Sequence, residues 1–229
     1  MQISGNVGEV VAAANGAAAQ QVVARIGGLS DLIVSEVQGR FYENTYRGRK
    51  FSLGHTAVTA LVAANAAATS LTATAQPVLG LYNPSTSGVN AVILQAALQD
   101  FLNNVTSVAY GTWEWYISSA QAAVSTGTKG FNRKTLAATS SQCLCFLGAT
   151  ALTGLVGSLT AFEPADFQNP SGLLTTTIAA STPTPSAGGV QNFDGSLIIP
   201  PGGVLALMTT LAVTTHSVSG RLLWDEVPA

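Results

Sequence analysis

Residues 196–208 read Ser-Leu-Ile-Ile-Pro-Pro-Gly-Gly-Val-Leu-Ala-Leu-Met, a pattern that predicts a strand, a tight turn and a second strand. The flanks are rich in apolar and β-branched side chains, which favour extended backbone. The prolines fix φ at roughly −65° and the glycines supply the positive φ that tight turns use. The same succession occurs upstream, where residues 77–82 and 89–98 are separated by Asn-Pro-Ser-Thr-Ser-Gly at 83–88. Such alternation of β-rich runs and turn residues is typical of an all-β sandwich or barrel.

A further run, residues 113–118, alternates strictly between two sets of side chains: Trp113, Trp115 and Ile117 in one, and Glu114, Tyr116 and Ser118 in the other. In a strand this pattern places both indoles on one face. We predict that this is a central strand and that residues 211–227 form the closing β segment. The fold class is therefore all-β, a jelly-roll-like β-sandwich of about eight strands with an N-terminal arm.

The domain organisation follows from two composition shifts. Residues 1–29 are rich in Ala, Gly and Val and cannot make a core alone. Alanine propensity allows a helix over residues 17–26, while small side chains equally fit an extended arm that orders against neighbouring subunits. Residues 1–50 are thus predicted to form an arm with a small β segment, and 51–229 the sandwich. The Thr-Pro-Thr-Pro-Ser-Ala-Gly-Gly stretch at 182–189 is predicted to be a long sandwich loop.

Charge is scarce over the whole chain. Only 9% of the 229 residues are charged, against roughly 25% in an ordinary soluble domain. A subunit of a permanent assembly tolerates such a surface better than a free monomer does. The net charge is −2, and the one basic cluster, Arg40, Arg47, Arg49 and Lys50, is small, so we expect no direct nucleic-acid binding.

The two cysteines, Cys143 and Cys145, stand two residues apart, which places both on one strand face but suits a mutual disulfide poorly. We predict buried free thiols and no metal site, because His55 and His216 are remote in sequence. Residues 143–162 carry no charge and are long enough for a membrane span. Interspersed Gly, Ser and Thr and the surrounding β pattern argue against one.

Residue types of a hydrolytic triad are present in His216, Ser217, Asp194 and Asp225, but without a nucleophile elbow. We interpret His216 as a hydrogen-bonded or exposed strand residue, and we interpret His55 likewise. No catalytic residue is assigned, and the protein is predicted not to be an enzyme.

Three further groups of side chains have residue types that occur in binding sites. Asp225 and Glu226 are adjacent, so a strand directs them to opposite faces. Glu163 and Asp166 have calcium-ligand chemistry, but a solvated turn is the favoured interpretation. Exposed tryptophans would stack on sugars, whereas alternation favours Trp113 and Trp115 as core. No metal, cofactor or phosphate-binding residue is assigned.

Three short segments resemble bacteriophage virion proteins. They are Gly-Arg-Phe-Tyr-Glu at 39–43 with Arg47-Gly48, Leu-Tyr-Asn-Pro-Ser at 81–85 with Gly-Val-Asn at 88–90, and Ile-Pro-Pro-Gly-Gly at 199–203. In this order they are similar to the jelly-roll decoration (cement) proteins of tailed phages, over residues 31–227.

This resemblance implies a homotrimer on the outer surface of the capsid that clamps the major capsid protein and so stabilises the phage head. It leaves residues 1–30 unexplained, and we expect this arm to be an assembly element. The alternative function is a receptor- or carbohydrate-binding module of a phage tail or head fibre.

Overall fold

The structure is a computed structural model that describes residues 25–26, 32–33, 41–55, 59–60, 70–71, 77–102, 113–119, 127–138, 140–148, 159–165, 167, 184–209 and 216–229. Contacts within the chain divide it into two units, Met1–Tyr42 and Glu43–Ala229. The sequence pattern placed this boundary later, between residues 50 and 51, where it would cut through a strand that begins at Lys50.

In the first unit, β1 (Arg25–Ile26) pairs with β2 (Leu32–Ile33) in antiparallel register. The end of the suggested 17–26 helix is therefore strand. The rest of that helix, and most of the predicted arm, lie outside the described residues.

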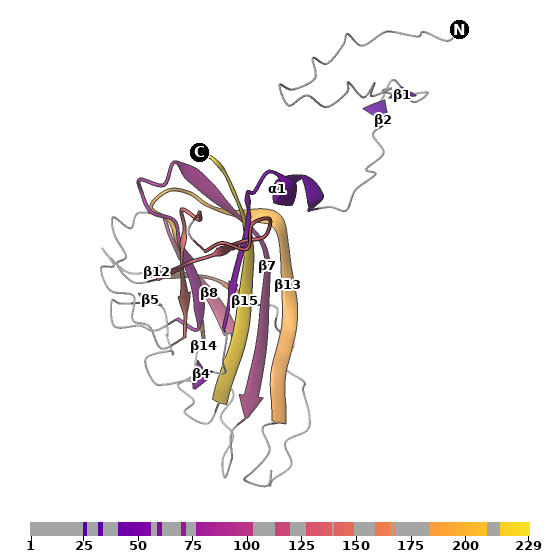
Figure 1. Cartoon of the computed structure of the whole chain (residues 1–229). Coiled ribbons are helices and arrows are strands. Elements are labelled where there is room, and N and C mark those ends of the chain that lie inside the picture. Colours follow the sequence, from indigo (N-terminus) through magenta and orange to yellow (C-terminus); the bar gives the residue numbers. More distant parts are fainter. Residues whose placement is uncertain are drawn as a thin grey trace. The chain divides into compact units, whose positions relative to one another are not determined.

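The second unit contains two antiparallel sheets, which confirms the all-β class (Figure 1). The six-stranded sheet has the order β10-β3-β15-β7-β13, with β4 also paired to β15. Its strands are β10 (Phe131–Asn132), β3 (Lys50–Gly54), β15 (His216–Pro228), β7 (Val89–Leu102), β13 (Thr184–Ile199) and β4 (Thr59–Ala60).

The seven-stranded sheet has the order β5-β12-β8-β14-β6-β11-β9. Its strands are β5 (Ser70–Leu71), β12 (Leu159–Pro164), β8 (Trp113–Ser118), β14 (Val204–Thr209), β6 (Leu79–Tyr82), β11 (Leu144–Leu147) and β9 (Thr128–Lys129). Strand β8 lies between β12 and β14, so the prediction of a central strand there is confirmed.

The chain passes repeatedly from one sheet to the other. Among the strands, β3-β15-β7-β13 are neighbours in one sheet and β6-β14-β8-β12 in the other. Each tight turn predicted from the sequence joins strands of different sheets, β6 to β7 and β13 to β14. These segments are therefore connections across the sandwich and not hairpins.

Asn83 holds these two connections together. Its Nδ2 donates to the carbonyl oxygens of Val89 at 2.7 Å and Ile199 at 2.9 Å, and its backbone N–H donates to Gly203 O at 2.9 Å. Gly202, at φ 84°, donates its N–H to Asn83 O at 2.7 Å. The positive φ expected of a glycine in this turn is present.

Side chains from both sheets form one core. Trp115 and Trp224 are fully buried in it, and Trp113 nearly so, which confirms the prediction that the tryptophans of β8 are core residues. The Trp224 ring stacks on Phe51 with centroids 6.1 Å apart, and Trp115 meets Phe193 edge-on at 5.6 Å. Aromatic pairs in these arrangements add to the stability that burial alone provides.

The opposite face of the seven-stranded sheet is buried as well. Tyr82, Tyr116, Phe146, Val204, Ala206 and Met208 form a second apolar cluster there. Every residue of β14 is buried, as expected for a strand covered on both faces.

Two sequence interpretations are corrected. Residues 184–189, predicted as a loop, begin β13 and pair with β7, where Pro185 stands opposite Phe101 at a register shift. Proline is tolerated there because β13 is an edge strand and needs no N–H on its outer side. Glu163, predicted in a turn, lies in β12 opposite Trp115.

The helix α1 (Tyr42–Tyr46) was not predicted. Arg47 N–H donates to Glu43 O at 2.9 Å, and the Arg47 and Glu43 side chains form an i,i+4 ion pair. Five residues are too few for periodicity to mark a helix. No helix in the described part of the chain is long and apolar enough to cross a membrane.

We predict that Gly130→Ala destabilises the sandwich by about 1–3 kcal/mol, the usual cost of overpacking a core. A Cβ at this position would overlap the buried Trp224 indole, which is itself held by Phe51. Gly188→Ala is the matched control, because its Cβ would meet its nearest atom at 3.4 Å, an ordinary contact. Urea unfolding of both variants gives the difference, and equal midpoints would contradict this packing.

Candidate functional site

The residues that supply hydrolytic chemistry in the sequence are not brought together. His216 and Asp225 lie on the same strand, β15, nine positions apart, which is roughly 30 Å at the usual rise per residue. The Asp225 carboxylate is bonded to Lys50 and Asn44 instead. Asp194 lies in β13 beyond Asn192, which pairs with Gln95, seven positions along β7 from Leu102, the partner of His216. The described backbone therefore does not build this triad.

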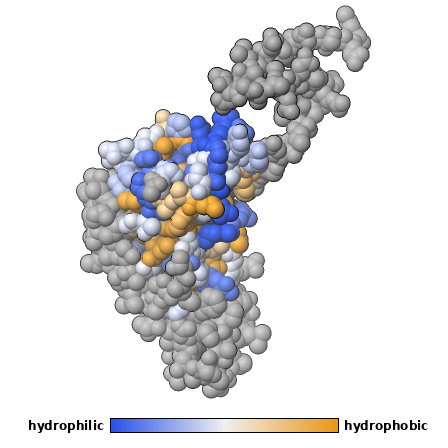
Figure 2. Space-filling view, in the orientation of Figure 1, coloured by the Kyte–Doolittle hydropathy of each residue, from blue (hydrophilic) through white to orange (hydrophobic). Residues whose placement is uncertain are grey.

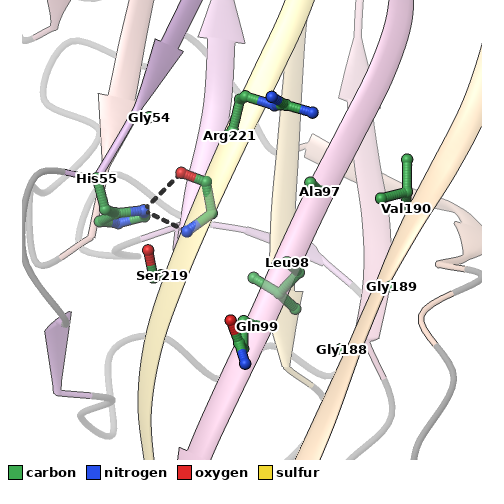
Figure 3. Close-up of a pocket in the computed structure, with 11 residues that line it drawn as sticks. Gly54, His55, Ala97, Leu98, Gln99, Gly188, Gly189, Val190, Ser219 and Arg221 are labelled. Carbon is green, nitrogen blue, oxygen red and sulfur yellow. Dashed lines mark hydrogen bonds between the residues drawn. The ribbon is translucent and has the colours of Figure 1, made fainter.

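His55 follows β3 and is held by the backbone of β15. Its Nδ1 accepts the Gly220 N–H at 2.9 Å and lies 3.2 Å from Gly220 O (Figure 3). The shorter contact makes Nδ1 an acceptor, so the proton belongs on Nε2, which is buried without a partner among the described residues. Burial lowers the pKa of His55, and the Gly220 carbonyl partly offsets this. A ring fixed in this way is a poor general base for its neighbour Ser219.

A groove crosses the outer face of the six-stranded sheet beside His55 (Figure 3). Its volume is about 610 Å³, and it extends from the end of β3 over β15 and β7 to β13. Glycines contribute much of its lining, and Gln99, Ser219 and Arg221 supply polar groups. The lining residues are Gly54, His55, Ala97, Leu98, Gln99, Gly188, Gly189, Val190, Ser219, Gly220 and Arg221.

A hydrogen-bonded ladder runs over three strands next to the groove. Arg221 Nη2 donates to Gln95 Oε1 at 2.7 Å, and Gln95 Nε2 donates to Asn192 Oδ1 at 2.9 Å. The ladder fixes the Arg221 guanidinium at the rim of the groove. An amide, a hydroxyl and a guanidinium suit hydrogen bonding to a polar ligand or a protein surface. Among the described residues that line the groove there is no carboxylate.

The sequence offered little signal for this groove. Gln99, Gly188 and Ser219 are isolated small or polar residues on three different strands. They are brought together only by the register in which Gly188 and Ser219 each stand opposite Gln99.

A buried ion pair lies on the same sheet under α1. Lys50 Nζ and Asp225 Oδ1 are 2.8 Å apart with both side chains about 95% buried, and Asn44 Nδ2 donates to Asp225 Oδ2 at 2.6 Å. Asn44 thus joins α1 to the sheet. Breaking a buried pair leaves an uncompensated charge, which costs far more than the pair contributes.

Glu226 faces the other way, which confirms that it and Asp225 point to opposite faces. Its carboxylate accepts hydrogen bonds from Ser141 Oγ at 2.7 Å, the Gln142 N–H at 2.9 Å and Trp224 Nε1 at 3.2 Å. Ser141 and Gln142 precede β11, so Glu226 connects the two sheets through polar contacts. All of these interactions are internal, and we assign Glu226 a structural role.

Both thiols are buried and unpaired with each other, as predicted. The Cys143 Sγ lies 3.7 Å from Asn83 Oδ1. Burial raises the pKa of Cys143 and of Cys145, and the nearby Glu226 carboxylate raises both further. Such thiols are poor nucleophiles.

Tyr116 and Glu114 lie on the face of β8 opposite the two tryptophans. Tyr116 Oη donates to Glu114 Oε2 at 3.1 Å, and burial, with the help of this carboxylate, raises the pKa of Tyr116 to about 12. The tryptophans and Tyr116 are buried and do not offer a stacking surface for sugars.

Among the described residues, no group of three His, Cys, Asp or Glu side chains lies close enough to hold a metal ion. Asp166, one of the two residues weighed as calcium ligands, lies outside those residues. Comparison of this chain with protein-family models, curated proteins and solved structures finds no match.

We predict that Lys50→Met lowers the free energy of unfolding by about 3–5 kcal/mol, because it strands the buried Asp225 carboxylate. The double variant Lys50→Met/Asp225→Leu should recover most of this loss, since neither charge then remains buried. Urea unfolding measures both variants. A double variant as unstable as the single one would show that the pair's attraction, and not the stranded charge, sets the cost.

We predict that neither cysteine of the native protein reacts with a thiol reagent at pH 8, and that both react in guanidinium chloride. The raised pKa means that the folded protein keeps both thiol protons while the unfolded chain loses them above about pH 8.5. The free energy of unfolding should therefore fall as pH rises past that value. Rapid labelling of the native protein would contradict the burial of the thiols.

Proposed function

We propose that this chain is a structural virion protein, a capsid decoration (cement) protein that stabilises a phage head through oligomeric contacts with the major capsid protein. The observation that carries the proposal is the strand order. The neighbours β3-β15-β7-β13 lie in one sheet and the neighbours β6-β14-β8-β12 in the other, and the chain passes repeatedly between the two sheets. This order resembles that of two Greek keys wrapped into a jelly roll. Jelly rolls are frequent in viral capsid proteins.

The distribution of polar groups supports an assembly role. Where the outer face of the six-stranded sheet is described, amides, hydroxyls and small residues predominate around Arg221. Val190 and Ile198 on this sheet are about half exposed. A surface with so little charge and with exposed apolar side chains suits permanent contact with other proteins.

The expected mechanism is the burial of interface area at several sites at once. A homotrimer on the outer surface of the capsid would contact several coat subunits together. Each contact after the first is then intramolecular, so weak single sites add up to firm attachment. The head gains stability because the bound trimers hold neighbouring coat subunits together in the closed lattice.

The alternative is a receptor- or carbohydrate-binding module of a tail or head fibre. The groove beside Arg221 is the observation that favours it, because Gln99, Ser219 and Arg221 offer the hydrogen-bonding groups that sugar hydroxyls need. Against it stands the burial of Trp113, Trp115 and Tyr116, which therefore offer no aromatic surface on which a sugar could stack.

We predict a homotrimer, either in solution or on the particle. Light scattering coupled to size exclusion measures the mass in solution, and reconstruction of decorated heads shows the contacts with the major capsid protein. Heads lacking the protein should lose DNA at a lower temperature than decorated heads.

A monodisperse monomer at micromolar concentration, with no trimer on particles, would contradict the proposal. Saturable binding of a capsular or cell-surface glycan that Gln99→Ala weakens would favour the alternative instead. Release of sugars or peptides from peptidoglycan by the pure protein would show an enzyme and overturn both.

A further inference from the structure

Two segments that are far apart in sequence form a basic patch at one end of the sandwich. We define it as Arg47, Arg49, Lys129, Arg133 and Lys134. Asn132 Nδ2 donates to Gly48 O at 2.6 Å, and the Arg133 N–H donates to Lys50 O at 2.8 Å. These contacts place the segment that contains β9 and β10 against the turn that follows α1. Only the first of the two segments was noticed in the sequence.

The patch carries an excess of positive charge. Glu43 pairs with Arg47, and the buried Asp225 compensates Lys50. Arg133 and Lys134 are exposed, and Arg49 is half-buried. Figure 2 shows hydrophilic residues gathered at the end of the sandwich where α1 lies, with hydrophobic residues beside them.

Large apolar and aromatic side chains stand among these cations. Tyr46 is 60% exposed, Phe131 48% and Leu136 74%. The Lys134 ammonium lies 4.7 Å from the centre of the Tyr46 ring, so the aromatic group and the cation are held together. Arginine and aromatic residues that share one patch are typical of the centre of a protein–protein interface.

The rest of the chain has the opposite charge. Six of its nine Lys and Arg residues lie within residues 47–50 and 129–134, and the remaining three are Arg25, Arg40 and Arg221. Eight of the eleven Asp and Glu residues lie elsewhere than Glu43, Asp225 and Glu226. Outside the two basic segments, acidic residues therefore outnumber basic ones in the sequence of a second copy.

One described segment complements the basic patch both in charge and in its exposed aromatic side chain. At the irregularity in β12, Phe162 is 46% exposed and is followed by the partly exposed Glu163. An aromatic group beside a carboxylate complements exposed cations set among Tyr46, Phe131 and Leu136.

We propose that the basic patch binds the Phe162–Glu163 segment of a second copy of this chain. The contact joins two different surfaces, so it is heterologous, and repetition of it closes a ring when the rotation fits. The inference rests on the proposed assembly of the chain with copies of itself, and it identifies the surfaces that meet.

Nucleic acid is the other polyanion that such a patch could bind. The observations favour protein, because the net charge of −2 gives no long-range attraction to a phosphate backbone. In addition, the exposed Leu136 and Phe131 would gain little burial against phosphates.

The test is sedimentation equilibrium of the full chain. Raising sodium chloride from about 50 mM to about 500 mM should weaken wild-type association about tenfold, because salt screens charges across a partly solvated contact. Arg133→Glu/Lys134→Glu should weaken it at least as much at the lower salt. Ser85→Glu/Thr86→Glu, which also adds negative charge at exposed positions but outside the patch, should leave it unchanged. Circular dichroism checks that each variant is folded.

A rescue experiment identifies the partner surface. Glu163→Lys alone should weaken association, and combined with Arg133→Glu/Lys134→Glu it should restore much of what either change removes, because opposite charges again meet. Restored association supports the contact. A triple variant that associates as weakly as Arg133→Glu/Lys134→Glu overturns it.

The outcomes also separate this inference from the proposed function. A wild-type chain that never associates, in solution or on particles, sinks both. A wild-type oligomer that is insensitive to salt and to patch reversal overturns only the basic patch as its interface. Binding of a single-stranded DNA oligonucleotide that Arg133→Glu/Lys134→Glu abolishes, with self-association unchanged, would reassign the patch to nucleic acid.

Discussion

The packing of two sheets face to face is the constraint on which the rest of this structure depends. Each strand must direct alternate side chains into the shared core, and Trp115 from one sheet and Trp224 from the other are among the largest residues to do so. The seven-stranded sheet is buried on its second face too. Among the described residues, many polar side chains accordingly lie on the outer face of the six-stranded sheet and in the connections, and Glu114 and Glu163 are exceptions in the seven-stranded sheet.

The polar groups that remain inside lie where strands end and backbone groups would otherwise lack partners. Asn83 bonds the two short connections, and Glu226 accepts N–H and O–H groups of the segment before β11. Leaving a buried polar group without a partner costs more stability than a typical hydrogen bond contributes. These residues therefore stabilise mainly by preventing a loss. Lys50 and Asp225 follow the same rule, because the ion pair is tolerated only while both charges are present.

Local sequence predicted those parts of the fold that local physics decides. Strict alternation at Trp113–Ser118 gave the bounds of β8 and the burial of its tryptophans, and Pro and Gly marked the connections at 83–88 and 200–203. The beginning of β13 was missed because its Pro and Gly residues disfavour strands, while the ladder to β7 holds them extended. The groove and the basic patch were missed for a different reason. Their residues come from segments that only tertiary pairing brings together, so no window of sequence contains them.

The sheet edges restrict how this sandwich can associate. At the ends of the strand orders of the two large sheets, three of the four strands are the two-residue strands β5, β9 and β10, too short to receive another chain. The fourth, β13, has 16 residues, but Pro185 lacks an N–H and the ladder is interrupted again around Asp194 and Gly195, which adopt φ values of 53° and 85°. Bulges and prolines of this kind protect an edge from pairing. Because backbone pairing is disfavoured at these edges, the proposed contacts between copies would be made by side chains. The exposed side chains that combine charge with apolar area then become the relevant ones, and in a chain with so few charges their placement decides which surfaces meet.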